Sequence, residues 1–110
     1  MTNNSKYLLV FTTCPGSITA KQIANTVVST NLAACAQTIP NIHSVFRWLN
    51  KTDSADEYLL LMKTTTDRYQ ALEDKIRAMH PYELPEIIAV PIIAGFDQYL
   101  RWIDTSTQIE

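Results

Sequence analysis

The chain has 110 residues, a formal net charge of −2 at pH 7 and a pI near 5.6, with 46% hydrophobic and 18% charged residues. This length fits one domain, and we expect residues 1–110 to form a single unit whose ordered part spans about residues 6–106. No run of Lys or Arg forms a basic stripe, which argues against nucleic-acid binding because phosphate neutralisation supplies most of that affinity. No apolar run approaches the roughly 18 residues of a membrane span, and residues 1–6 lack the apolar segment of a secretory signal. We therefore expect a cytoplasmic protein that binds neither nucleic acid nor membrane.

The two cysteines, Cys14 and Cys35, lie in apolar, strand-like contexts without the spacing of a metal knuckle. So few cysteines do not support a disulfide framework, which fits a reducing compartment. Cys14 comes just before a Pro-Gly pair, and we expect it to be the more exposed thiol and a candidate ligand for soft Cu(I). Cys35 has the features of a small buried hydrophobe and is the weaker candidate ligand.

The first predicted elements are a strand and a helix. Residues 6–14 are apolar and β-prone, which predicts a strand. A Pro-Gly pair breaks it, and Ser17 is a candidate N-cap for a helix over residues 17–31. Asn31 fits the end of that helix because Asn tolerates left-handed backbone geometry.

The next elements predict a long antiparallel hairpin. Residues 32–40 predict a second strand, which continues over residues 42–49 after a bulge or bend at Pro40. Residues 50–56 are polar and predict a turn. Residues 57–66 predict the third strand, which is apolar through its centre.

The remaining elements are a helix, a strand and a short terminal helix. Asp67 is a candidate N-cap for a helix that Pro81 ends near His80, because proline disfavours helical geometry in the residue before it. Residues 86–93 predict the fourth strand, and Asp97 is a candidate N-cap for the last helix.

The resulting order, β-α-β-β-α-β with a terminal helix, predicts an α+β fold of the ferredoxin-like sandwich type. Both long helices then cover one face of an antiparallel sheet. The other face carries large apolar residues, and a chain this short has only another copy of itself to cover them. We therefore expect a homo-oligomer.

Five local motifs occur along the chain. They are Leu32-Ala33-Ala34-Cys35, Trp48 with Lys51, Leu61-Met62-Lys63-Thr64, His80-Pro81-Tyr82-Glu83 with Pro85-Glu86-Ile87-Ile88, and Tyr99-Leu100-Arg101-Trp102. In this order and spacing they resemble the CutA family of divalent-cation tolerance proteins, over about residues 7–106. The resemblance implies a PII-like homotrimer of ferredoxin-like subunits, whose long hairpin strands pair between subunits. It also implies copper binding and a role in tolerating divalent metals, and it brings no assigned reaction, so an enzyme is the less favoured class.

The chain departs from the family pattern at candidate metal ligands. Some members carry a cysteine at the end of the first strand and two adjacent histidines before the Pro-Tyr pair. In this chain Thr12 and Met79 stand at two of these positions, and His80 remains. This pattern predicts an incomplete three-ligand copper site, in which Glu83, Met79 or a residue from another subunit must join His80.

His80 and Glu83 are the candidate metal ligands, for copper or another divalent cation. Neutral imidazole binds Cu(II) well, and Cu(II) is the most strongly held ion of the first-row divalent series. The alternative for His80 is a histidine that bonds a free carbonyl at a helix end. The alternative for Glu83 is a solvated surface carboxylate.

A second interpretation is a PII-like sensor or adaptor that binds an anionic ligand in an inter-subunit cleft formed by Lys63, Tyr82, Glu86, Trp48 and Glu57. A lysine at the end of a buried strand must reach a carboxylate or solvent, and Glu57 and Glu86 are the expected partners of Lys63. Such a pair also fits a purely structural salt bridge. Tyr82 and Trp48 are equally consistent with packed aromatics, the latter at a subunit interface.

Two other function classes are less favoured. His80 and Glu86 have the side chains of an acid–base pair, but composition alone does not define an active site. An RNA-recognition surface on the same fold needs paired aromatics and a basic surround, and the first strand offers one aromatic residue without such a surround. A metal-responsive trimer is the interpretation that the sequence favours.

Overall fold

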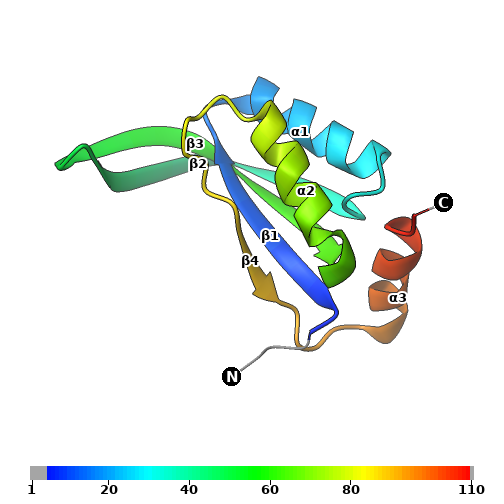
Figure 1. Ribbon diagram of the computed structural model, residues 1–110. Coiled ribbons are helices and arrows are strands. Elements are labelled where there is room, and N and C mark those ends of the chain that lie inside the picture. Colours follow the sequence, from blue (N-terminus) through cyan, green and yellow to red (C-terminus); the bar gives the residue numbers. More distant parts are fainter. Residues whose placement is uncertain (1–4, 110) are drawn as a thin grey trace.

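The computed structural model describes residues 5–109, which form an antiparallel four-stranded sheet and three helices (Figure 1). The elements in chain order are β1 (Tyr7–Cys14), α1 (Ser17–Ser29), β2 (Cys35–Trp48), β3 (Lys51–Thr65), α2 (Thr66–Met79), β4 (Ile88–Pro91) and α3 (Asp97–Ser106). The strand order across the sheet is β2-β3-β1-β4. The predicted α+β, ferredoxin-like fold with a long hairpin and a short terminal helix is confirmed.

Helices α1 and α2 pack together on one face of the sheet and close the core (Figure 1). Side chains that alternate along β1 and β3 point toward these helices, and Val10, Leu60 and Met62 have no exposed surface. Ile23 of α1 and Leu72 of α2 are also fully buried in this cluster. Burial of one such side chain contributes roughly 1.5–3 kcal/mol, so this layer is a large source of stability for the fold.

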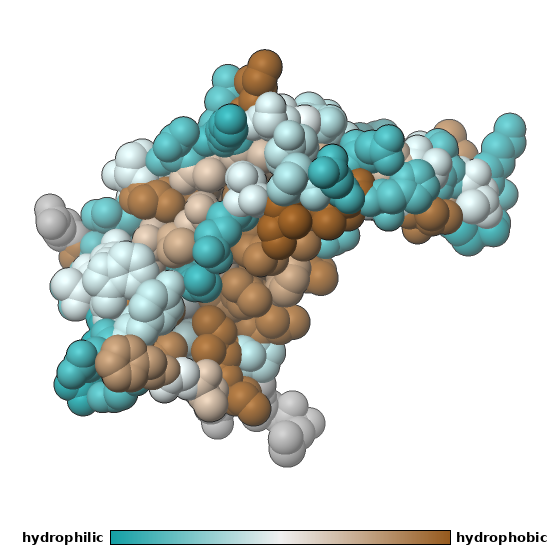
Figure 2. Space-filling view, turned by 180° about the vertical axis from the view of Figure 1, so that it is seen from behind, coloured by the Kyte–Doolittle hydropathy of each residue, from teal (hydrophilic) through white to brown (hydrophobic). Residues whose placement is uncertain are grey.

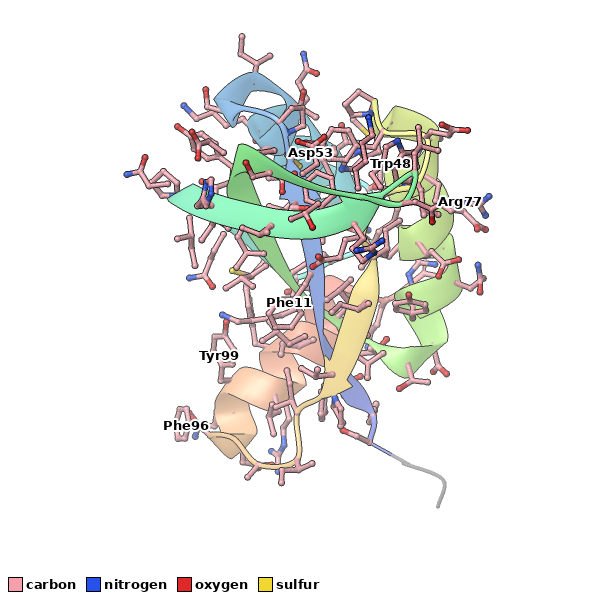
Figure 3. All side chains as sticks on the ribbon, turned by 90° about the vertical axis from the view of Figure 1, so that its left-hand side faces the viewer. Phe11, Trp48, Asp53, Arg77, Phe96 and Tyr99 are labelled. Atoms are coloured by element: carbon pink, nitrogen blue, oxygen red, sulfur yellow. The ribbon has the colours of Figure 1, made fainter. Side chains whose placement is uncertain are left out.

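The opposite face of the sheet is not covered by α1 or α2, and it carries apolar side chains (Figure 2). Ile39 of β2, Ile88 of β4 and Val90 of β4 have exposed fractions of 41%, 53% and 41%. Phe11 and Tyr99 lie on this same side, away from α2 (Figure 3). We call this surface, formed by Phe11, Ile39, Ile88 and Val90, the open face.

The hairpin of β2 and β3 is longer than the sequence predicts. The two strands pair as far as Trp48 and Lys51, so the prediction of a turn over residues 50–56 is wrong. The turn consists of Leu49 and Asn50, whose φ angles are 51° and 66°. Two consecutive left-handed residues form a tight turn whose twist matches that of the strands. The polar residues 51–56 belong to an exposed part of β3 and do not form a turn.

A register shift between Ile39 and Ile42 divides the hairpin into a base and an arm. Asn41 has a φ of 64° at this point, and the predicted irregularity at Pro40 is confirmed. Residues 42–57, which we call the hairpin arm, extend beyond the body of the domain (Figure 1). The arm therefore offers surface that packing within one chain does not use.

The helices begin one or two residues away from the predicted N-caps. The residues at the N-cap positions are Gly16, Thr65 and Phe96, and none of them makes a side-chain cap hydrogen bond. Ser17, Asp67 and Asp97, the predicted N-caps, lie in the first turns of α1, α2 and α3 instead. The carboxylates of Asp67 and Asp97 still favour helix formation there, because the N-terminus of a helix carries partial positive charge.

The ends of the helices follow the prediction more closely. Asn31 has a φ of 61° just beyond α1, as expected for a left-handed residue. Pro81 follows the end of α2, and His80 before it is extended, with φ −76° and ψ 134°. Strand β4 is shorter than the predicted 86–93, because its pairing with β1 stops after four residues, Ile88–Pro91. No helix within residues 5–109 is long and apolar enough to cross a membrane.

Candidate functional site

The segment between α2 and β4 brings together most of the residues with candidate functions. Residues 80–87, which we call the α2–β4 connection, belong to neither a helix nor a strand. Pro81 and Pro85 each fix one φ angle and so restrict the backbone on either side of Tyr82. The position of the connection therefore depends on contacts made by its side chains.

His80 is buried at the start of this connection, with 8% of its surface exposed. Its Nε2 lies 2.7 Å from the carbonyl oxygen of Thr13 at the end of β1. Its Nδ1 accepts a hydrogen bond from the backbone N–H of Tyr82 at 3.2 Å. Because Nδ1 is an acceptor, the proton of the neutral ring resides on Nε2, which donates to Thr13. Both ring nitrogens of His80 are thus engaged within the chain.

Tyr82 connects the same segment to the hairpin. Its hydroxyl donates a hydrogen bond to Oε2 of Glu57 in β3, at 2.7 Å. Burial of Tyr82, this hydrogen bond and the charge of Glu57 raise the pKa of the phenol above its usual value. The hydroxyl consequently remains a donor at neutral pH, and Glu57, which is only 6% exposed, keeps a hydrogen-bond partner.

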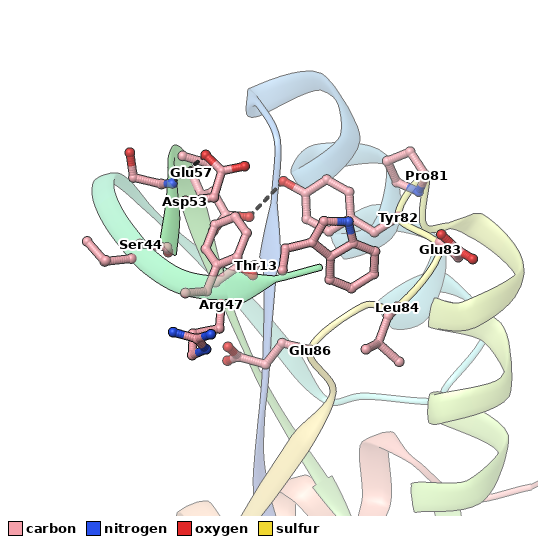
Figure 4. A pocket seen from close by; sticks show the side chains of 15 residues that line it. Thr13, Ser44, Arg47, Asp53, Glu57, Pro81, Tyr82, Glu83, Leu84 and Glu86 are labelled. Carbon is pink, nitrogen blue, oxygen red and sulfur yellow. Dashed lines mark hydrogen bonds between the residues drawn. The ribbon is translucent and has the colours of Figure 1, made fainter. Parts of the chain in front are cut away.

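A groove of about 840 Å³ lies between the hairpin arm and the α2–β4 connection (Figure 4). Its lining comes from the end of β1, both strands of the arm and the connection: Thr13, Ser44, Val45, Phe46, Arg47, Trp48, Asp53, Ser54, Ala55, Glu57, Pro81, Tyr82, Glu83, Leu84 and Glu86. Four of the five residues predicted for a ligand cleft, Trp48, Glu57, Tyr82 and Glu86, are therefore brought together, and Glu83 joins them.

The described residues that line the groove carry more acidic than basic groups. The carboxylates belong to Asp53, Glu57, Glu83 and Glu86, and the cationic group belongs to Arg47. Clefts lined by one sign of charge concentrate ions of the opposite sign. This lining thus favours cationic over anionic ligands.

Lys63, the fifth residue predicted for the cleft, lies elsewhere in the chain. Its Nζ donates hydrogen bonds to Oε1 of Gln37 at 3.1 Å and to the hydroxyl of Tyr99 at 3.2 Å. The predicted partners Glu57 and Glu86 are not used. Lys63 and Glu57 both belong to β3, but six strand residues, roughly 20 Å, separate them.

The two thiols are placed differently from the prediction. Cys14, expected to be the more exposed, has no exposed surface and belongs to the helix-covered core. Burial, and to a lesser degree the charge of Glu57, raises the pKa of Cys14 to about 11. Since the thiolate is the metal ligand, a buried and protonated Cys14 is not available as one. Cys35, at the start of β2, is partly buried, and both cysteines are free.

A copper site built on nitrogen and sulfur ligands does not fit one chain. His80 has both ring nitrogens occupied, and Cys14 is buried and protonated. Among residues 5–109, no group of three or more His, Cys, Asp or Glu side chains is arranged to hold a metal ion. The exposed carboxylates of Asp53, Glu83 and Glu86 along the groove remain as candidate oxygen ligands on the surface of one chain.

The sequence did not point to two residues of this region. Thr13 holds His80 through its backbone carbonyl, a group that every residue carries and that no sequence pattern marks. Asp53 lies within the segment predicted as a turn, and its place along the groove follows from the longer β3. The alternation of residues along the arm, continued through residues 51–56, is the signal that would have included Asp53.

Comparison with known proteins places this fold and site in a family. The model of the CutA1 divalent ion tolerance protein family matches residues 8–106. This chain therefore belongs to the CutA1 divalent ion tolerance protein family, whose name describes tolerance of divalent ions.

Similar proteins occur in plants and bacteria. The chain is 40% identical over 92% of its length to the chloroplastic CutA protein of Arabidopsis thaliana, and 39% identical over 90% to the divalent-cation tolerance protein CutA of Thermus thermophilus. It covers 56% of the first relative and 96% of the second, so it spans about half the length of several curated relatives that it matches. The crystal structure of CutA from Xylella fastidiosa superposes with a TM-score of 0.92 at 38% identity, covering 94% of this chain and all of that one.

Proposed function

We propose that this chain acts in divalent-cation tolerance as a homotrimer that binds divalent metal ions, copper among them, through carboxylate oxygens of the groove. The observation that carries the proposal is the gathering of Glu57, Glu83 and Glu86 along one groove that the hairpin arm and the α2–β4 connection enclose. Family membership supplies the link to divalent cations.

The proposed site uses oxygen ligands and is completed between subunits. Glu83 and Glu86 are exposed in one chain, so their carboxylates are free to bind an ion without breaking a core contact. Carboxylates bind a broad range of divalent ions, and Cu(II) is held most strongly within the first-row series. The exposed hairpin arm and the open face leave room for another copy to supply the remaining ligands.

The trimer and the compartment are part of the same proposal. Apolar side chains on the open face support association with copies of the chain, because monomers rarely expose contiguous apolar patches of several residues. Two free cysteines support a reducing, cytoplasmic location. The corresponding assembly would enclose three copies of the groove.

Metal titration of carboxylate variants tests the proposal. We expect the native protein to bind Cu(II) at a fixed ratio per chain against a competing chelator, and the double variant Glu83→Gln and Glu86→Gln to weaken binding at least about tenfold, or 1.4 kcal/mol. Asp74→Asn is the matched control, because Asp74 is an exposed carboxylate on α2, outside the groove. Equal affinity of the double variant and the control would reject the groove as the metal site.

A further inference from the structure

The imidazole of His80 is buried and hydrogen-bonded at both ring nitrogens. Only 8% of the surface of His80 is exposed, and each of its ring nitrogens has a backbone partner. The partners lie far apart in sequence, since Thr13 is the penultimate residue of β1 and Tyr82 belongs to the α2–β4 connection. The ring also packs against Tyr82, with a distance of 4.8 Å between ring centroids.

These contacts join the connection to both central strands of the sheet. His80 reaches β1 through the carbonyl of Thr13, and Tyr82 reaches β3 through the carboxylate of Glu57. The N–H of Tyr82 donates to His80, so the two links share a residue and support one another. Because the connection lies outside the sheet ladder, these side-chain bonds, together with the packing of Ile87 on the core, hold it in place.

We propose that His80 is a positioning residue that holds the α2–β4 connection as one wall of the groove, and that it is not a metal ligand. This inference deepens the proposed function, because the wall carries Glu83 and Glu86. A metal bound at Nε2 would take the place of the hydrogen bond to Thr13. A metal at Nδ1 would take the place of the bond from the Tyr82 amide. In the first case a buried backbone carbonyl would lose its partner, and in the second a partly buried amide would, which opposes metal binding.

The side chain at position 80 must donate a hydrogen bond to the carbonyl of Thr13 and accept one from the amide of Tyr82. The neutral Nε2–H form of imidazole meets this requirement in a planar, compact shape. Glutamine at the same position provides a donor near the place of Nε2, whereas alanine provides none. Comparison of these two substitutions thus separates positioning from metal ligation.

The first test is nitrogen-15 NMR of the histidine rings in the unmodified, full-length protein, before and after saturation with Zn²⁺. We expect His80 in the neutral Nε2–H form, with a slowly exchanging ring proton and unchanged ring resonances after Zn²⁺ is added. His43 serves as the internal reference, because its side chain is 61% exposed on the hairpin arm. The Nδ1–H form, or loss of the Nε2 proton on addition of Zn²⁺, would overturn the proposal.

The second test compares His80→Ala, His80→Gln and the control His43→Ala. We expect His80→Ala to speed hydrogen exchange of the Tyr82 amide and to weaken Zn²⁺ binding by at least about tenfold each, as expected for the loss of a buried hydrogen bond. His80→Gln should restore Zn²⁺ affinity to near that of the unmodified protein, and His43→Ala should change neither measurement. Equal loss of affinity in His80→Gln and His80→Ala, with normal exchange of the Tyr82 amide, would identify His80 as a ligand instead.

These measurements also separate this inference from the proposed function. Absence of Zn²⁺ binding in the unmodified protein would reject the metal site. The ring tautomer and the exchange of the Tyr82 amide would still confirm or reject the positioning role, because neither requires a metal.

Discussion

The two faces of the sheet are built from alternate residues of the same strands, yet they have opposite surroundings. On the helix-covered face, Val10, Leu60 and Met62 have no exposed surface. On the open face, Ile88 and Val90 keep about half of theirs. Because the side-chain period of a strand is two, one sequence encodes both a closed core and an apolar surface. The first stabilises the single chain, and the second is the surface that we propose other copies cover.

The largest effect should come from the helix-covered face. Ile76→Ala on α2 removes a fully buried side chain, so we expect it to lower the free energy of unfolding by about 2–5 kcal/mol. Chemical denaturation at several protein concentrations measures this loss and separates it from any change in assembly. A loss of less than about 0.5 kcal/mol would mean that α2 is not part of the core.

The next effect should be on association rather than on folding of the chain. Ile88→Asp places a charge on the open face, on the edge strand β4, and we expect it to reduce the mass of the assembly to that of one chain. The matched control is Ile18→Asp, because Ile18 is 73% exposed on α1, away from the open face. Light scattering of both variants compares them, and an intact assembly in Ile88→Asp would show that the open face is not the interface.

The third prediction concerns the reactivity of Cys14, the cysteine on the helix-covered face. Cys14 lies in the helix-covered core, and burial raises its pKa to about 11, so at pH 8 far less of it is thiolate than of an ordinary exposed thiol. In a Cys35→Ser variant we expect alkylation of Cys14 to be at least about a hundredfold slower in the native protein than in guanidinium chloride. Mass spectrometry measures the rates, and similar rates in both conditions would contradict the burial of Cys14.

The smallest effect concerns a polar contact at the edge of the open side. Asp104 of α3 accepts a hydrogen bond from the hydroxyl of Tyr7 and pairs with Lys6, each at 2.8 Å. Desolvation alone would raise the pKa of Asp104, but the hydrogen bonds from Lys6 and Tyr7 outweigh it and lower the pKa below 3.8. A lowered pKa stabilises the fold above the pKa of the unfolded chain, and this stabilisation is lost as the pH falls through the folded value.

We therefore expect Asp104→Asn to be slightly less stable than the unmodified protein at pH 7. The difference should shrink as the pH is lowered from 5 to 2, because protonation removes the charge that the variant already lacks. Thermal unfolding across this range measures it. A difference that grows with acidity would contradict the direction of the pKa shift.

Much of the fold could be predicted because it depends on local patterns. Apolar and β-prone runs predicted the four strands, and Pro81 predicted the end of α2. The hairpin turn was missed because Leu49 rarely adopts the left-handed geometry that it has here. Helix starts were misplaced by one or two residues, because extended residues without side-chain caps precede each helix.

The candidate site was harder to predict because it depends on contacts between distant parts of the chain. The Nε2 partner of His80 is a backbone carbonyl 67 residues away in the sequence. No sequence pattern predicts a contact over this separation with an atom that every residue carries. The burial of Cys14 likewise depends on the helices that close over the end of β1. By contrast, Trp48, Tyr82 and Glu86 were grouped in advance as part of a PII-like cleft between subunits, and the structure brings them to one groove within a single chain.

The central claim is that the open face is covered by copies of the same chain, which complete the groove between subunits. The most direct test is the mass of the unmodified protein by multi-angle light scattering at micromolar concentration. The account predicts three times the 12.5 kDa of one chain. A mass of 12.5 kDa would contradict it, because the open face would then be exposed to solvent and the groove would have to act within a single chain.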